Sequence, residues 1–158
     1  MSSSILVILP SDASLDKAPE NKIGSYVAWL DEPLILEGEW EVALLDITYP
    51  SQWEIEYHPE HFKFEQLPQL LVACRGLVEL GYWGNTKHPL LRQFVPEPRT
   101  QYRPEIRYRE FNNLMFMPIK KGLKRVDSIN IDILDELGQP VLFTDGKVSC
   151  TLQFQKLS

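Results

Sequence analysis

Two stretches decide the fold class of this chain: LILEGEWEVALLDITYP at Leu34–Pro50 and INIDILDELGQPVLFTDGKVSCTLQF at Ile129–Phe154. Both are rich in strand-forming residues and alternate apolar and polar positions with the period of two that strands require. Neither contains a grouping of residues that could do chemistry. The two stretches therefore predict a mainly β, antiparallel protein and favour a structural building block over an enzyme.

The segment Trp40–Tyr49 is the strongest predicted strand. It is apolar on both of its faces, which would carry Trp40, Val42 and Leu44 on one side and Ala43, Leu45, Ile47 and Tyr49 on the other. Such a strand is either central and buried on both sides, or lies at a subunit contact. Gly38 stands in the tight connection before it and can adopt a positive φ.

The C-terminal stretch predicts two further strands, separated by turns at 135–140 and 145–146. In each strand apolar residues alternate with polar ones, so each strand should have one apolar face and one polar, solvent-exposed face. This pattern is typical of an antiparallel β-sandwich or jelly roll. The predicted core residues are Trp40, Val42, Leu44, Ile129, Ile131, Ile133, Val148, Leu152 and Phe154.

Shorter predicted elements fill the rest of the chain. Strands are expected at 5–9, 26–30, 78–83, 90–95, 106–108 and 114–119, and turns at 31–33 and 85–89. The segment 66–76 fits a strand or a short helix equally well.

Length and composition place limits on the kind of protein. With 158 residues and 44% hydrophobic content, the chain suits a single β-rich domain over 1–158, and its 12 prolines disfavour long helices. No apolar run is long enough to span a membrane, and the N-terminus lacks the features of a signal peptide. Cys74 and Cys150 match no disulfide framework or metal motif, which predicts buried thiols in a reducing compartment.

Charge is unevenly distributed along the chain. Residues 1–70 hold 13 acidic and 3 basic side chains, a net of −10, whereas residues 71–125 hold 11 basic and 4 acidic, a net of +7. Residues 126–158 have a net charge of −3, from 5 acidic and 2 basic side chains. Such polarity could steer association with another copy or a partner, or the segments could neutralise each other within one fold.

The sequence offers no convincing catalytic, cofactor or metal site. His58 and His61 are close enough to share a metal, but no third ligand is evident, and a solvated loop is the favoured interpretation. The carboxylates Glu37, Glu39 and Glu41 fit an exposed rim better than an acid–base pair. No nucleophile motif and no glycine-rich phosphate loop is present.

Two groups of residues are candidates for contact with partners. Aromatic anchors are expected at Trp53, Tyr57, Tyr82 and Trp83, which would otherwise be satellite core beneath long loops. An arginine group comprises Arg99, Arg103, Arg107 and Arg109. Arginines among tyrosines suit nucleic acid, but the interrupting glutamates and a pI near 5.1 favour a protein–protein contact or internal neutralisation.

The segment Leu36–Leu44, LEGEWEVAL, with the following Ile47–Pro50, resembles a block found in proteins of Polinton/Maverick-type elements and related DNA viruses. The same family has an N-terminal strand ending in Leu-Pro-Ser, similar to 9–11 here, and a Pro-Xaa-Asn pattern, similar to 19–21. Its C-terminal elements resemble 129–133, 138–141 and 146–154, and the residues 90–92 also resemble a family element. The middle, from about 51 to 84, departs from the family and is shorter.

This resemblance implies a capsid-associated or virion protein, such as a penton-like minor capsid protein with a jelly-roll core. It implies no enzymatic activity and no cofactor. The implied partners are further copies of the chain or other capsid proteins, and the implied location is a virion or the interior of a host cell. An alternative is a small β-sandwich binding module that recognises a host or viral protein through the region 53–83.

Overall fold

The computed structural model describes residues 3–51, 53–54, 69–97 and 105–157. All of the regular elements in these ranges are strands. Within the same ranges, no helix has the length and apolar character needed to cross a membrane. The mainly β, antiparallel class expected from the sequence is confirmed.

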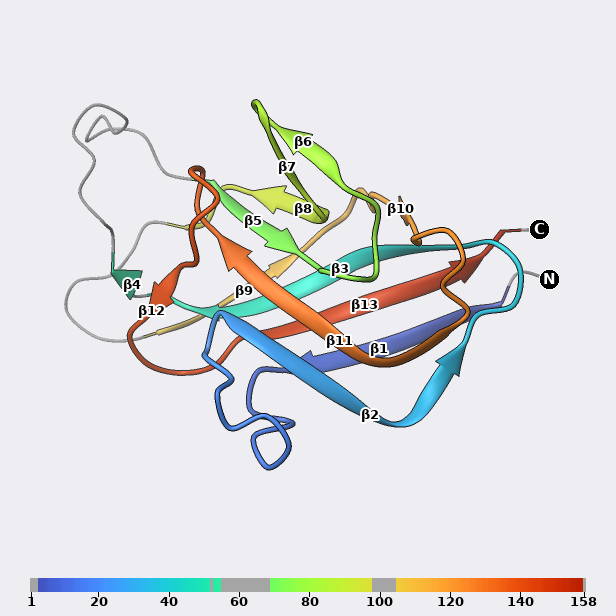
Figure 1. Cartoon of the computed structure of the whole chain (residues 1–158). Coiled ribbons are helices and arrows are strands. Elements are labelled where there is room, and N and C mark those ends of the chain that lie inside the picture. Colours follow the sequence, from blue (N-terminus) through green and yellow to red (C-terminus); the bar gives the residue numbers. More distant parts are fainter. Residues whose placement is uncertain (1–2, 52, 55–68, 98–104, 158) are drawn as a thin grey trace.

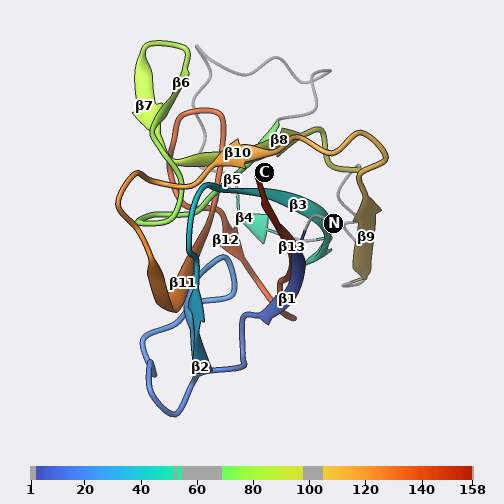
Figure 2. The same cartoon turned by 90° about the vertical axis from the view of Figure 1, so that its right-hand side faces the viewer.

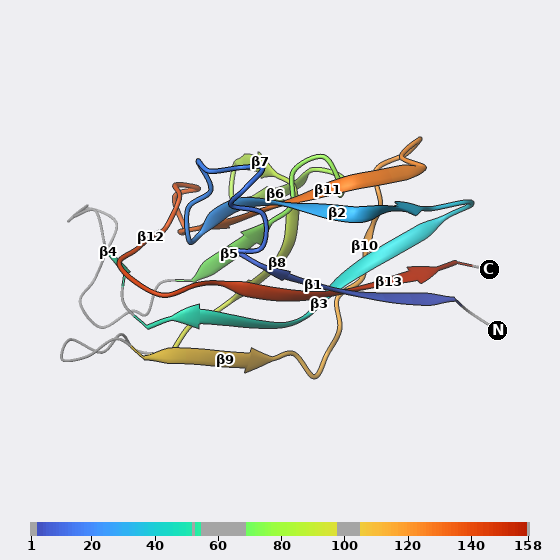
Figure 3. The same ribbon diagram turned by 90° about the horizontal axis from the view of Figure 1, so that it is seen from below.

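Two antiparallel sheets form the body of the molecule and lie over one another as two layers (Figure 3). The first sheet contains β1 (Ser4–Pro10), β13 (Ser149–Lys156), β3 (Trp40–Pro50), β10 (Met117–Pro118) and β9 (Ile106–Glu110), the last two both pairing with β3. The second sheet contains β2 (Ser25–Ile35), β11 (Arg125–Leu134), β5 (Leu70–Ala73) and β8 (Leu90–Phe94), in that order.

The chain passes back and forth between these layers (Figure 1). β1, β3, β9 and β13 belong to the first sheet, while β2, β5, β8 and β11 belong to the second, and only β5 and β8 are successive partners in one sheet. An antiparallel double sheet wound in this way is a jelly roll. The jelly-roll-like sandwich expected from the sequence is therefore what the structure shows.

Two smaller antiparallel pairs complete the structure. β4 (Trp53–Glu54) pairs with β12 (Leu142–Phe143), and β6 (Gly81–Trp83) pairs with β7 (Thr86–His88) as a hairpin. The β6–β7 hairpin projects beyond the rest of the molecule (Figure 2). Here the expected turn at 85–89 is wrong, because Thr86–His88 is a strand and the turn lies at Gly84–Asn85.

The core fills the space between the two sheets. All nine residues expected in the core belong to one buried cluster, and none of them is more than 8% exposed. Val42 and Phe154, which are paired in register, come from the first sheet, and Ile129 and Ile131 come from the second. The apolar rows of β11 and β13 thus face each other across the sandwich.

The predicted faces of β3 are partly wrong because the strand contains a bulge. Its pairing with β13 shifts at Leu45: Leu44 lies opposite Leu152, and Asp46 lies opposite Thr151. An extra residue in one strand reverses the alternation beyond it. Ile47 and Tyr49 consequently point into the same core as Trp40, Val42 and Leu44, instead of pointing to the opposite face.

The predicted turn at 31–33 is also wrong, because the chain does not reverse its direction there. β2 is continuous from Ser25 to Ile35. The pairing of β2 with β11 is irregular in the middle, where the four residues 30–33 lie opposite the single residue Asp127. The tight connection that follows contains Gly38, whose φ of +88° agrees with the expected positive value. The ambiguous segment 66–76 contains the strand β5.

Candidate interaction surfaces

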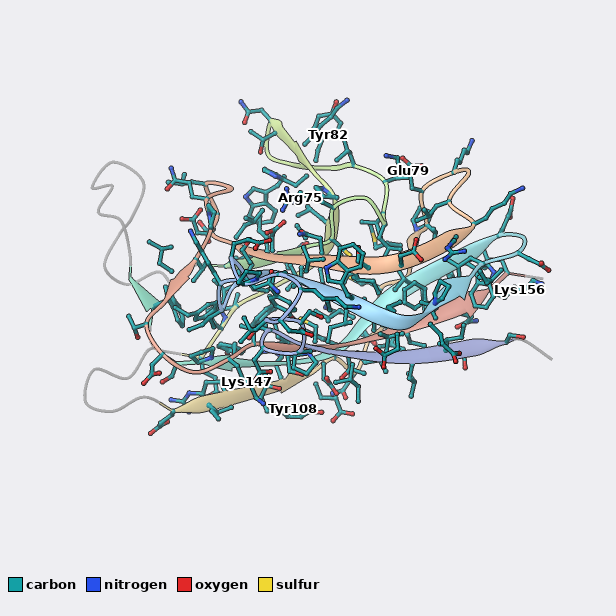
Figure 4. The ribbon with its side chains drawn as sticks, turned by 60° about the horizontal axis from the view of Figure 1, so that its bottom comes forward. Arg75, Glu79, Tyr82, Tyr108, Lys147 and Lys156 are labelled. Atoms are coloured by element: carbon teal, nitrogen blue, oxygen red, sulfur yellow. The ribbon has the colours of Figure 1, made fainter. Side chains whose placement is uncertain are left out.

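The sequence-predicted contact residues lie in separate parts of the molecule. Tyr82 lies on the β6–β7 hairpin and points outward on one side. Arg107 and Arg109 belong to β9, which lies on the opposite side, where Tyr108 of the same strand is labelled (Figure 4). Tyr57, Arg99 and Arg103 fall outside the described residues.

Trp53 lies in the core, so the expectation of an exposed anchor is wrong for this residue. It is 6% exposed and belongs to the main buried cluster. The short pairing of β4 with β12 brings its ring edge-to-face against Phe143, with centroids 6.0 Å apart. Such an arrangement is favourable for two aromatic rings. Trp53 therefore corresponds to the satellite-core alternative that the sequence left open.

The β6–β7 hairpin carries one aromatic residue inward and one outward. Trp83 is half-buried against a small cluster formed by Leu71, Ala73, Leu90 and Leu134. Its indole Nε1–H donates to the carbonyl oxygen of Glu136 at 2.9 Å, which fixes the hairpin to the 135–140 turn. Trp83 consequently positions the hairpin, and its ring is only partly available to a partner.

Tyr82 occupies the outward face of the same hairpin. It is 67% exposed, and the Nζ of Lys87 lies 5.2 Å from its ring centroid. A cation at this distance from an aromatic face is attracted by the ring. Tyr82 and Lys87 thus form a small projecting patch, which we name the hairpin patch.

Arg107 is neutralised within the fold. Its guanidinium contacts the carboxylates of Glu97 at 3.0 Å and Glu105 at 3.1 Å, and its side chain is 24% exposed. Two acidic partners around one arginine leave little net positive charge for a phosphate backbone. This arrangement corresponds to the internal neutralisation considered from the sequence.

Arg109 lies in a different environment from Arg107. One of its guanidinium nitrogens donates to the carbonyl oxygen of Val95 at 3.4 Å, and the group lies 5.9 Å from the ring centroid of Phe111. The guanidinium of Arg92 is closer to the same ring, at 4.2 Å. Burial, followed by repulsion from Arg109, lowers the pKa of Arg92. Both cations thus help to cover a buried phenyl ring, a packing role for long basic side chains.

The two thiols are poorly reactive near neutral pH. Cys74 and Cys150 are free and buried in the sandwich core. Burial raises the pKa of the Cys150 thiol to about 12 and also raises that of Cys74. Because the thiolate is the reactive form, neither group is suited to nucleophilic or redox chemistry near neutral pH.

The described residues contain no group of three His, Cys, Asp or Glu side chains that could hold a metal ion. His58 and His61, the pair considered for metal binding, lie outside the described residues.

An exposed apolar row on β1 was missed at the level of sequence. Leu6 and Ile8 are 63% and 66% exposed, whereas Leu9 is buried and Ile5 and Val7 pack against the core. The run ILVIL shows no alternation because both of its faces are apolar. Which of these faces lies on the outside of the sandwich, and that the strand stands at the edge of its sheet, follow only from the three-dimensional arrangement of the strands.

Comparison with known proteins supports a relation of fold. No protein-family model matches the sequence, and no curated protein matches it. Among solved structures, the chain is similar to the crystal structure of the mavirus penton protein, with a TM-score of 0.57 and 6% sequence identity. The alignment covers 97% of this chain and 99% of that one. At this identity the likeness shows the shared fold.

Proposed function

We propose that this chain is a non-enzymatic structural protein of a virus or virus-like element, a penton-like minor capsid or virion-associated subunit. The observation that carries the proposal is the likeness to a penton protein over nearly the full length of both chains. A likeness of that extent concerns the whole jelly roll and not one part of it.

The sequence resemblance supports the same proposal independently. The blocks at 36–44 and 47–50 correspond to the β2–β3 connection and β3, and the C-terminal elements 129–133 and 146–154 fall largely within β11 and β13. These three strands are interior to their sheets and supply 12 of the 27 buried residues of the main core cluster. The blocks that resemble Polinton/Maverick-type proteins thus lie largely in strands that build the core.

The proposal also agrees with the chemistry of the described surface. A capsid subunit needs a rigid core and projecting elements that contact neighbouring proteins. The β6–β7 hairpin projects from the body and is fixed by Trp83, and the hairpin patch at its surface combines an aromatic ring with a cation. Tyrosine in such a position is a frequent anchor in protein interfaces.

Co-assembly with the other capsid proteins of the same element tests the proposal. The proteins are co-expressed and fractionated on a density gradient, and this chain is expected to sediment with the particles in a fixed ratio. The control is Ile131→Asp, which places a carboxylate in the core and prevents folding. Recovery of the native chain only at the top of the gradient, while particles form without it, would refute the proposed role.

A binding module is the second candidate, and the hairpin patch is the observation that favours it. In that case the folded chain captures a host or viral protein through Tyr82 without entering a particle. Tyr82→Ala is expected to abolish capture, since it removes the exposed ring. An equally exposed site elsewhere, changed as Ile106→Ala, should leave capture intact. Equal loss with both variants would exclude the hairpin patch as the binding site.

A further inference from the structure

The outer strands of the two sheets differ in how their free edges are protected. An exposed strand edge carries unpaired N–H and C=O groups, and proteins usually cover it, charge it or keep it short. The free edge of β2 is covered by the preceding loop. Asn21 exchanges two hydrogen bonds with the backbone of Val27, at 3.0 and 2.9 Å, and the Ser14 hydroxyl accepts from the N–H of Trp29 at 2.8 Å.

The remaining outer strands are charged or short. β9 reads IRYRE, β8 contains Arg92, and β10 has only two residues. β1 is the exception in the described part of the chain. It has seven residues, SILVILP, and among the described strands it pairs with β13 alone. No side chain between Ser3 and Ser11 is charged.

The hydrogen bonds beside β1 show which of its backbone groups point outward. Ser11 N–H donates to Val148 O at 2.7 Å, and Lys156 N–H donates to Ser3 O at 3.0 Å. In an antiparallel pair, residues bonded to the neighbour alternate with residues whose groups point away. The odd-numbered residues therefore face β13, and the N–H and C=O groups of Leu6 and Ile8 face the free edge.

The same two residues carry the exposed apolar side chains of β1. Leu6 and Ile8 are 63% and 66% exposed on the outer face of the sheet. The outward residues of the adjoining β13 are also uncharged; they are Ser149, Thr151, Gln153 and Gln155. Free backbone groups and exposed apolar side chains thus coincide on a neutral surface of a chain whose net charge is −6.

We propose that β1 pairs antiparallel with β1 of a second copy, which joins the first sheets of both molecules into one. With a two-fold axis near Val7, Leu6 lies opposite Ile8 of the second copy, and the reverse holds. Each pair brings two sets of outward backbone groups into register and places two apolar side chains side by side on the outer face, where they contact each other. A neutral, self-complementary strand suits such an isologous contact, because it brings no like charges of two chains of net charge −6 into direct contact.

The inference rests on the edge geometry and not on the proposed function, so either can fail alone. The test is the mass of the purified chain by light scattering over a series of concentrations and salt. The mass should rise from 18.3 kDa to twice that value with concentration, and the rise should persist in high salt, since no charge pair holds the contact.

A matched pair of variants locates the contact. Ile8→Lys puts a charge into the proposed contact and should raise the dissociation constant roughly 10-fold or more, since two symmetry-related pairs change together. Ile106→Lys makes the same change at an isoleucine that is 69% exposed on β9, at the opposite side of the same sheet. This second variant should dimerise like the native chain.

A third variant tests the backbone pairing itself. Leu6→Pro removes an outward N–H without breaking the ladder with β13, which is where proline is tolerated in a sheet. It should give a folded monomer, and circular dichroism checks the fold. In the native dimer, the amide protons of Leu6 and Ile8 should exchange more slowly as concentration rises. A native chain that stays at 18.3 kDa, or equal weakening by Ile8→Lys and Ile106→Lys, would overturn the proposal. So would slow exchange of these amides only when a different protein is added.

Discussion

Truncation of Ile131 to alanine gives a direct measure of how tightly the sandwich is packed. Ile131 lies in β11, opposite Tyr26 of β2, and its exposed fraction is 0%. Ile131→Ala removes three carbons, and burial of each contributes about 0.8 kcal/mol, so the transfer contribution alone is about 2.4 kcal/mol. The cavity left between two sheets that cannot collapse adds to it. We therefore expect a loss of about 3–4 kcal/mol in the free energy of unfolding, within the range of about 2–5 measured for such changes.

Equilibrium unfolding in urea, followed by tryptophan fluorescence, measures this loss. The midpoint should fall while the slope stays unchanged, because the surface exposed on unfolding is nearly the same. In a thermal melt the same loss corresponds to roughly 6–16 °C for a chain of this size. Ile106→Ala is the matched control, since Ile106 is 69% exposed, and it should change stability by no more than about 0.5 kcal/mol. Equal effects of the two substitutions, or a loss below about 1 kcal/mol at Ile131, would refute the described packing.

Three further predictions concern a turn, a hairpin and a thiol. Gly38→Val forces a β-branched residue to φ near +88° and should lower stability by at least about 1–2 kcal/mol in a urea titration; unchanged stability would contradict the described turn. Trp83→Phe keeps a ring in place but loses the bond to the Glu136 carbonyl, which should cost about 1 kcal/mol, and an unchanged midpoint would show that this bond does not hold the hairpin. The pKa of Cys150 is raised from 9.0 to about 12, so the folded state holds its proton when the unfolded state has lost it. The stabilisation that this protonated thiol contributes is fully present below pH 9 and should be lost as pH rises towards 12. Cys150→Ala should therefore weaken the dependence of the free energy of unfolding on pH in that range, and an unchanged dependence in the variant would contradict the prediction.

Local sequence patterns were sufficient to predict the interior strands. β11 and β13 show a clean alternation of apolar and polar residues, because each has one face in the core and one towards water. Gly38 could be placed in a tight connection because only a residue without Cβ adopts its φ readily. The fold class depends mainly on such features, and it could therefore be predicted from the sequence.

The irregularities of pairing could not be predicted in this way. The bulge at Leu45 depends on how β3 aligns with β13, a strand about 100 residues later in the chain. The irregularity at residues 30–33 depends likewise on the match of β2 to β11. A pattern read along one strand contains no information about an extra residue relative to its partner, so the faces of Ile47 and Tyr49 were predicted wrongly.

The candidate surfaces were harder to predict than the fold, for a related physical reason. Whether an aromatic residue anchors a partner or fills the core depends on what covers it. Trp53 is covered by β12, which brings Phe143 against its ring. Tyr82 lies on the β6–β7 hairpin, and no described element covers its ring in this way. Both residues look alike in sequence, with polar and turn-forming neighbours.

The apolar run of β1 shows the same limit most clearly. A strand that is apolar on both faces is typical of the buried interior of a sheet, and 5–9 fits that pattern. In the structure one apolar row of β1 enters the core, and the other lies on the outer face of the first sheet, where Leu6 and Ile8 are exposed. The apolar outer row is unusual for this sheet, because the adjoining interior strand β13 carries only polar residues on the same face. The outward backbone groups of Leu6 and Ile8, together with their exposed apolar side chains, are the physical reason to expect a second chain at that edge.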